Sequence, residues 1–144
     1  MHTCGIQRGF DWTEYLKLAK KLAGQTNISP SKEAMLRSSV SRAYYAVFCK
    51  TRNYLRDIEM DNSIPQGGKV HQYVINKFIN SKDNQRREIG INLDRLRVDR
   101  NRVDYDDSVK NLSSMADMDL KIAQKILSIL ETLQKKKYSC HCFT

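Results

Sequence analysis

The densest run of polar side chains in the sequence lies between positions 100 and 107. It reads Arg100-Asn101-Arg102-Val103-Asp104-Tyr105-Asp106-Asp107. An arginine guanidinium is always charged and presents five donors in a rigid fork, so it suits a phosphate or a carboxylate. Asp104 follows Arg100 by four residues, a spacing that puts both on one helix face and lets them pair. We therefore expect an Arg100–Asp104 pair, with the Tyr105 hydroxyl near the same helix end.

Arg100 also interrupts an apolar stripe that predicts the buried face of a helix. The stripe consists of Ile89, Leu93, Leu96 and Val103. Position 100 completes this series, and a guanidinium there is costly unless it meets a partner or a water-filled cleft. Two interpretations stay open. Arg100 is structural, through a stem that reaches the surface or a buried ion pair, or it points into a cleft or dimer interface where it holds a phosphate.

Three further side chains are candidates for the same cleft. His71 begins an apolar helical segment, and its imidazole titrates near neutral pH. Tyr44 and Tyr45 are adjacent in a long helical segment, so one ring can pack while the other presents its hydroxyl to a cleft. The alternative for all three is ordinary packing, with His71 against backbone at a helix start and both tyrosines in the core.

The cysteines predict neither a disulfide framework nor a metal site. In Cys140-His141-Cys142 the two cysteines are separated by a single residue. Only His2 and Cys4, at the other end of the chain, could supply further ligands for a metal ion. A structural zinc site normally uses two separated pairs of ligands. We therefore expect a C-terminal tail over residues 138–144, no metal and no cofactor.

The elements that must position these residues are helices throughout. Only 6 Gly and 2 Pro occur in 144 residues, which disfavours an all-β fold. The periodicity predicts helices over about 11–23, 30–59, 69–80, 85–103 and 113–137. The first has a capping box of Asp11 and Glu14, a hydrophobic staple of Phe10 and Tyr15, and a stop at Gly24. Its apolar stripe is Leu16, Ala19, Leu22 and Ala23.

The arrangement of these helices follows from their apolar faces. The second helix is expected to begin at Ser29-Pro30, an N-cap followed by proline at the first helical position. It is apolar on more than one face, which favours the centre of a bundle, and it is expected to be the longest. The sequence therefore predicts an all-α, antiparallel up-and-down bundle of about five helices. One domain spans 11–137, between tails at 1–10 and 138–144.

The charge and hydropathy exclude some functions. A formal net charge of +9 fits an anionic partner such as nucleic acid, or simply a basic soluble protein. The longest apolar run, 43–49, has seven residues, far short of the roughly 18–20 that a membrane span needs. The first residues contain no apolar segment of the kind that directs secretion. We therefore expect a cytoplasmic protein without a membrane partner.

Taken together, three segments resemble the HEPN domain, a nucleotide-binding domain of higher eukaryotes and prokaryotes. They are 41–48 (SRAYYAVF), the helix start at His71 with Val74 and Phe78, and 96–105 (LRVDRNRVDY). The resemblance covers about residues 11–133 and points to the small stand-alone prokaryotic branch. It implies a helical bundle, a homodimer, and a minimal nucleotidyltransferase as partner in a toxin–antitoxin pair.

The resemblance also implies site residues. Active HEPN ribonucleases carry an arginine followed by a polar residue and, shortly after, a histidine, and they cleave RNA without metal. Arg100-Asn101 matches the first half, whereas positions 105–107 hold Tyr, Asp and Asp. Carboxylates there are ionised at pH 7 and cannot replace an imidazole. The implied binding residues are Arg100, Asn101, Asp104, Tyr105, Tyr45 and His71; in a nuclease, Arg100 and Tyr105 would be catalytic.

Three functions follow from these observations. The first is a HEPN-like nucleotide- or RNA-binding component of a toxin–antitoxin type system, paired with a nucleotidyltransferase, with weak or no cleavage. The second is a non-catalytic homodimeric interaction module in which Arg100 and Asp104 are purely structural. The third is a metal-independent endoribonuclease.

Overall fold

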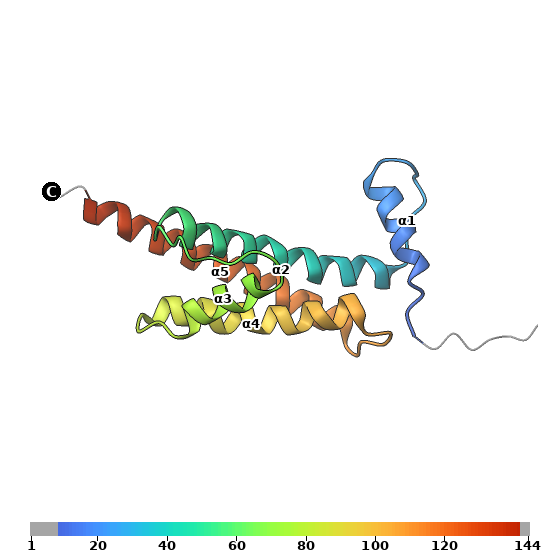
Figure 1. Ribbon diagram of the computed structural model, residues 1–144. Helices are drawn as coiled ribbons and strands as arrows, with labels where there is room; N and C mark the ends of the chain where they lie inside the picture. The colour runs from blue at the N-terminus through green and yellow to red at the C-terminus, as the bar shows by residue number, and fades with distance from the viewer. Residues whose placement is uncertain (1–8, 142–144) are drawn as a thin grey trace, which may run out of the picture.

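The computed structural model describes residues 9–141, which form five α-helices and, within that range, no strand. The helices are α1 (Thr13–Leu22), α2 (Lys32–Asp57), α3 (Lys69–Ile79), α4 (Asn84–Tyr105) and α5 (Leu112–His141). In Figure 1, α2, α4 and α5 lie lengthwise together with the shorter α3, and α1 stands apart at one end. The predicted all-α class and helical bundle are confirmed.

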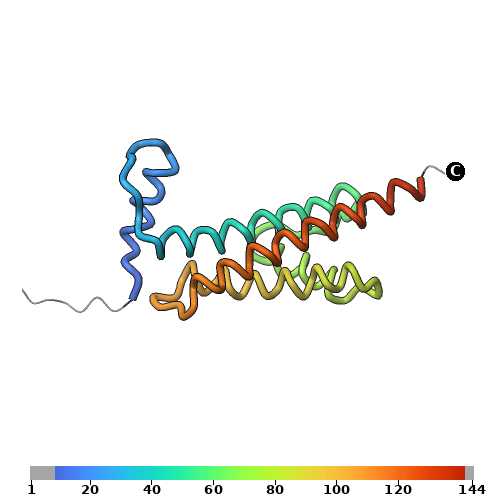
Figure 2. The backbone as a smooth tube through the Cα atoms, turned by 180° about the vertical axis from the view of Figure 1, so that it is seen from behind, coloured from blue at the N-terminus to red at the C-terminus, as the bar shows by residue number. Residues whose placement is uncertain are grey.

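Ion pairs near the helix ends define the directions of the long helices. Arg86 at the start of α4 pairs with Glu59, just after the end of α2. Lys137, near the end of α5, reaches the same carboxylate at 3.8 Å. The end of α2 therefore lies beside the start of α4 and the end of α5. Consequently α4 runs opposite to α2 and α5, which run the same way (Figures 1 and 2).

The connection from α2 to α3 is an exception to strict alternation. Residues 58–68 carry the chain back along α2, so that α3 starts beside the middle of α2 (Figure 2). Ring contacts follow in the same order on both helices: Phe48 meets His71, and Tyr54 meets Phe78. The alternation of an up-and-down bundle therefore holds from α3 through α5, whereas α2 and α3 are parallel.

The core lies where α2, α4 and α5 meet and where α3 covers α2 and α4. As predicted, α2 is central, packing against each of the other four helices. Its predicted rank as the longest helix is wrong, because α5 has 30 residues and α2 has 26. No breaker follows the lysines at 135–137, so α5 continues to His141, beyond the expected start of the tail at 138.

Two predicted helix starts shift for identifiable reasons. Ser31, not Ser29, is the N-cap of α2, because its backbone is extended (ψ 150°) and its hydroxyl accepts a bond from the Ala34 N–H at 3.2 Å. In α1, Trp12 occupies the N-cap position. The Glu14 carboxylate accepts from the Ser31 N–H at 2.7 Å instead of closing a capping box, so it ties α1 to the start of α2.

The apolar stripe predicted to bury α1 is exposed. No residue of α1 is buried, and Leu16 and Leu22 are 60% and 78% exposed. The helix projects from the end of the bundle (Figure 1), where no neighbouring helix covers the stripe. The predicted staple contact does form, since the Phe10 and Tyr15 rings meet edge to face at 5.2 Å.

Candidate functional site

The inner face of α4 carries Arg100 into the bundle next to α2. The residue is only 8% exposed, as its place on the stripe predicts. Its guanidinium carbon lies 5.2 Å from the Tyr44 ring centre and 5.3 Å from that of Tyr45. One terminal nitrogen lies 3.8 Å from the Asp104 carboxylate, so the expected pair is present but long. The buried Nε has no hydrogen-bond partner among the described residues, which leaves a donor unused.

The two adjacent tyrosines have different environments. Tyr44 is fully buried, and burial raises the pKa of its hydroxyl to about 12. Tyr45 is half-buried and lies between the Arg100 and Arg42 guanidiniums. One ring therefore packs in the core while the other contributes a partly exposed aromatic surface.

The first turn of α3 brings His71 to this cluster. Its Nδ1 lies 2.7 Å from the Tyr44 hydroxyl, and its ring stacks on Phe48 at 4.2 Å. Burial lowers the pKa of His71, and the charges of Arg100 and Arg97 lower it further. The imidazole is thus neutral at pH 7. Because the high pKa of Tyr44 keeps its proton on oxygen, Nδ1 accepts that bond and Nε2 carries the hydrogen.

Arg97 is a member of the cluster that sequence reasoning missed. It lies one turn before Arg100, and its Nη1 donates to the Gln72 side-chain oxygen at 2.8 Å, across to α3. Its buried Nε is also without a hydrogen-bond partner in the described chain. The available signal was the spacing of three from Arg100, which places both guanidiniums on one side of α4.

Asp104 connects the cluster to a surface groove of about 350 Å³ between α1 and α2. The groove is lined by Tyr15, Leu18, Ala19, Leu22, Ser38, Ser41, Arg42 and Asp104. The Asp104 carboxylate accepts a bond from the Ser41 hydroxyl at 3.3 Å. An anion that approaches Arg100 from this side has to compete with that carboxylate.

Two of the predicted binding residues lie elsewhere on α4. Asn101 is exposed, and Tyr105 is 73% exposed. At about 100° per residue they are turned away from the buried Arg100. The structure therefore brings together Arg100, Asp104, Tyr45 and His71, and leaves Asn101 and Tyr105 on the outer face of the same helix.

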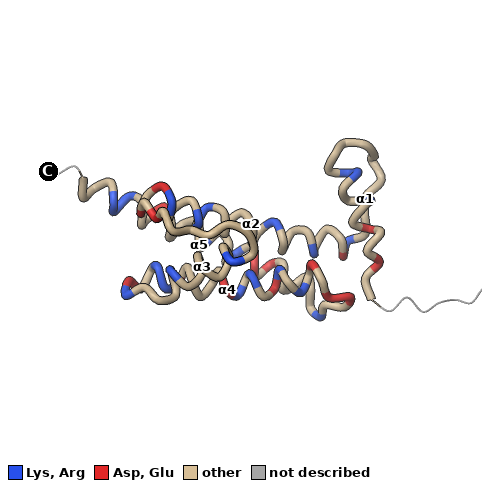
Figure 3. Tube along the Cα trace, viewed as in Figure 1, with Lys and Arg blue, Asp and Glu red and all other residues tan. Residues whose placement is uncertain are grey.

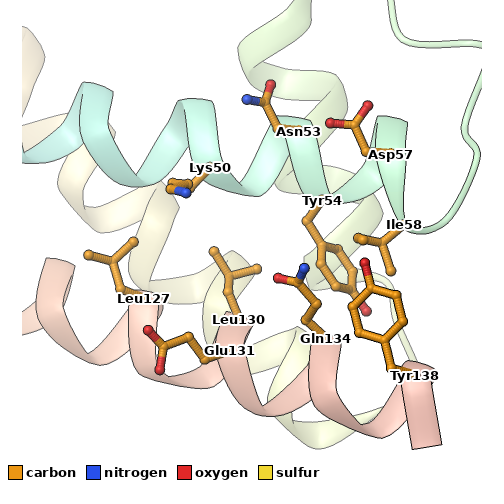
Figure 4. Close-up of a pocket in the computed structure, with 10 residues that line it drawn as sticks. All are labelled: Lys50, Asn53, Tyr54, Asp57, Ile58, Leu127, Leu130, Glu131, Gln134 and Tyr138. Carbon is orange, nitrogen blue, oxygen red and sulfur yellow. The ribbon is translucent and has the colours of Figure 1, made fainter.

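A second groove, of about 500 Å³, runs between α2 and α5 toward their C-terminal ends (Figure 4). Leu127, Leu130 and Tyr138 line it from the α5 side, and Tyr54 lines it from the α2 side. Asn53 and Asp57 on α2 point away from α5. The polar groups of this groove do not converge on a common point, so it is a weaker candidate for a binding site than the arginine cluster.

The described residues also bear on metals and membranes. Cys140 is a free, exposed thiol at the end of α5, whereas His2, Cys4 and Cys142 lie outside the described residues. Within residues 9–141, no three His, Cys, Asp or Glu side chains gather in a way that could hold a metal ion. None of the helices in this range is both long enough and apolar enough to cross a membrane.

The cluster combines the kinds of group that can bind a ligand with a phosphate and an aromatic base: guanidiniums for the phosphate, and aromatic rings for the base. The Nε atoms of two guanidiniums have no hydrogen-bond partner among residues 9–141, a half-buried tyrosine offers a ring face, and a neutral imidazole offers a donor. Lys and Arg positions are spread over several helices (Figure 3). Comparisons with protein-family models, with curated proteins and with solved structures found no match.

Proposed function

We propose that the chain is a HEPN-like protein that binds single-stranded RNA or a nucleotide at Arg97 and Arg100, with weak or no cleavage. In this proposal it acts as a homodimer paired with a nucleotidyltransferase in a toxin–antitoxin type system. The observation that carries the binding proposal is the position of these two arginines, each with an Nε that has no hydrogen-bond partner among the described residues, beside aromatic rings. The Arg100 guanidinium lies over the Tyr45 ring, and the charges of Arg100 and Arg97 both act on His71.

The chemistry of the ligand follows from this pair. Guanidiniums bind phosphate oxygens with two donors at once, and aromatic faces stack on bases of any sequence. The net charge of +9 adds attraction for a polyanion that falls with salt. Asp104 opposes binding because a phosphate must displace its interaction with Arg100. We therefore expect weak binding that depends strongly on salt and weakly on sequence.

Binding is tested by fluorescence anisotropy with a labelled single-stranded RNA at low and at physiological salt. Arg100→Gln and Arg97→Gln should each weaken binding about tenfold, the loss of one charge-assisted contact. Asp104→Asn should tighten it by freeing Arg100. The matched control is Arg102→Gln, on the same helix with its side chain 57% exposed. Equal losses of RNA affinity in all three arginine variants would mean that binding depends only on overall charge, and would contradict a specific site at Arg97 and Arg100.

Cleavage is tested separately with end-labelled RNA in EDTA. We expect at most slow turnover, because positions 105–107 hold no histidine and the Nδ1 of His71 is already hydrogen-bonded to Tyr44. Rapid cleavage that is lost in both Arg100→Gln and Tyr105→Phe would instead establish the endoribonuclease alternative. Circular dichroism of each variant checks that lost activity is not lost folding.

The second candidate function is a non-catalytic homodimeric interaction module. It is favoured by the exposed apolar side chains on α4, among them Ile91, Val98 and Tyr105. If no RNA or nucleotide binds, and Arg100→Gln changes only the free energy of unfolding, this function takes the place of the first.

A further inference from the structure

One face of α2 is basic along more than half of the helix. Arg42, Tyr45, Cys49, Arg52 and Arg56 follow one another at spacings of three, four, three and four residues, which places them on the same side of a helix. Arg42 and Arg56 are exposed, and the other three are half-buried. Positions 34–56 contain no Asp or Glu. This basic face therefore attracts anions.

The basic face adjoins the arginine cluster at two aromatic rings. The Tyr45 ring lies between two guanidiniums, whose carbon atoms are 5.5 Å (Arg42) and 5.3 Å (Arg100) from its centre. The Phe48 ring stacks on the imidazole of the cluster at 4.2 Å, and the Arg52 guanidinium carbon lies 6.0 Å from the same ring centre. Arg42 and Arg52 therefore flank the cluster along α2.

The basic face ends in a groove of about 550 Å³ between α2, the 58–68 loop and the start of α3. Arg52 and Arg56 line it from the α2 side. The Arg52 guanidinium donates to its neutral neighbour Asn53 at 3.0 and 3.2 Å, and it forms no ion pair with any residue between 9 and 141. A guanidinium stays charged and offers several donors to phosphate oxygens. Arg52 is therefore available to a phosphate that enters the groove.

Two carboxylates lie beside these arginines, and neither blocks the face. Asp57 pairs with Arg56 at 2.7 Å, but both side chains are more than half exposed, and exposed pairs of this kind contribute little free energy. Asp61, in the wall of the groove, accepts hydrogen bonds from the Tyr73 hydroxyl at 2.8 Å and the Ser63 N–H at 2.9 Å instead of pairing with either arginine. A phosphate can therefore replace Asp57 at Arg56 at low cost.

We propose that single-stranded RNA lies along this face of α2, from Arg42 past Tyr45 to Arg52 and Arg56. The inference rests on the proposed function and narrows its ligand to an oligonucleotide. The two outer arginines are 14 residues apart, about 21 Å at 1.5 Å per residue, which matches about six nucleotides at ~3.4 Å each in a stacked strand. The arginines bind phosphates, and the Tyr45 ring with the adjacent Arg42 offers a planar surface for a base. A mononucleotide reaches only the cluster.

The length of the site is tested by competition. Unlabelled adenylate oligomers of one, three, six and nine nucleotides compete with a labelled RNA, followed by fluorescence anisotropy. Affinity should rise up to six nucleotides and change little beyond. Three further phosphate contacts should also steepen the slope of log affinity against log salt by about 2, at ~0.7 per contact on a single strand. A mononucleotide that matches the hexamer in affinity or in salt slope overturns the proposal.

The position of the site is tested with variants of the basic face. Arg52→Gln and Arg56→Gln should each weaken hexamer binding about fivefold, the loss of one exposed charge-assisted contact, and leave mononucleotide binding unchanged. The matched control is Lys50→Gln, on the same helix but in the groove shared with α5. Equal losses in all three variants, or no loss in either arginine variant, would overturn the proposal. Circular dichroism of each variant checks that it is folded.

The variant Arg100→Gln keeps failure of the basic face distinct from failure of the proposed function. It should weaken binding of the mononucleotide and of the hexamer, because both ligands use the cluster. If Arg100→Gln weakens binding while Arg52→Gln and Arg56→Gln do not, the cluster remains a site and the basic face is excluded. If only the variants of the basic face weaken binding, that face binds RNA and the cluster does not. If no oligomer binds, both are overturned.

Discussion

Arg37 and Asp119 are both fully buried, but only Arg37 has hydrogen-bond partners for its charged group among the described residues. The Arg37 Nη1 donates to the carbonyls of Val103 at 2.8 Å and Asp106 at 2.7 Å, at the C-terminal end of α4, while its guanidinium lies over the Phe10 ring. The negative end of the helix dipole thus receives a cation. Asp119, by contrast, has no hydrogen-bond donor on either carboxylate oxygen among the described residues.

The first prediction concerns the pH dependence that Asp119 imposes on stability. Burial, together with the charge of the nearby Asp99, raises the pKa of Asp119 to about 7, and the charge of Arg95 opposes this shift. Because the unfolded carboxyl titrates near 4, folding takes up a proton, and stability falls as the pH rises from about 4 to about 7. Asp119→Asn should therefore gain on the order of 2 kcal/mol at pH 8 and almost nothing at pH 4.

Urea unfolding of both proteins at the two pH values measures this difference. Asn is close to Asp in shape and stays neutral, so packing is retained. An equal effect at both pH values would mean that the charge of Asp119 is not the cause.

The second prediction concerns the neutral imidazole of His71. Burial and the charge of Arg100 lower its pKa from the ordinary value near 6.5. Arg100→Gln should raise the pKa of His71, and Arg102→Gln, on the exposed side of α4, should leave it unchanged. An NMR titration of the ring protons reads both values. An unchanged pKa of His71 in Arg100→Gln would show that the two side chains do not interact, and would contradict the proposed site.

At the scale of elements, the approach of α4 to α3 depends on one glycine. A Cβ added at Gly90 would lie 2.5 Å from the backbone nitrogen of Ile79 and 2.9 Å from the carbonyl carbon of Phe78. Backbone atoms of a packed helix cannot give way as a flexible side chain can. The absence of a side chain at position 90 therefore sets how closely α3 and α4 pack, and with it the distance of Arg97 from Gln72.

The third prediction follows from this contact. Gly90→Ala should lower the free energy of unfolding by about 2 kcal/mol, although alanine is the better helix former, because overpacking of a core outweighs propensity. The control is Gly68→Ala, where φ is −62° and nothing lies within 4 Å of the added carbon. That change should be neutral or slightly stabilising. Gly90→Ala as stable as wild type would show that α3 can shift freely.

At the scale of the molecule, α1 is an arm docked through few contacts. The Phe10 N–H donates to the Asp107 carbonyl at 2.6 Å, and the Trp12 indole N–H donates to the Asp107 carboxylate at 2.8 Å. With no buried residue in α1 itself, little apolar area opposes its release. Segments with few buried contacts open before the rest of a structure.

The fourth prediction uses the single tryptophan of the chain, Trp12, as a reporter of this arm. Its fluorescence in a urea titration should change at lower denaturant than the helical circular dichroism, which follows the bundle. Phe10→Ala should move the fluorescence transition further from the dichroism transition, since it removes a ring that contacts both Trp12 and Arg37. Coincident transitions in both proteins would show that arm and bundle unfold as one unit.

The sequence by itself determined which residues share a helix face and where helices break. Local spacing was enough to predict five helices, the burial of Arg100 on its stripe and its pair with Asp104, since these depend on residues within two turns of one another. It also allowed one of the adjacent rings of Tyr44 and Tyr45 to pack while the other reaches a cleft, but it did not decide which of them is buried.

Only the tertiary structure decided which apolar faces find a neighbour. The stripes of α1 and α4 have the same helical periodicity, yet Leu22 is exposed and Leu96 is buried. The approach of Arg97 to Gln72, and of Arg37 to the end of α4, joins residues far apart in the chain. The α2–α3 loop, which runs back along α2, makes such contacts possible. Periodicity records that a face is apolar, whereas the partner that buries it is set by how the whole chain packs.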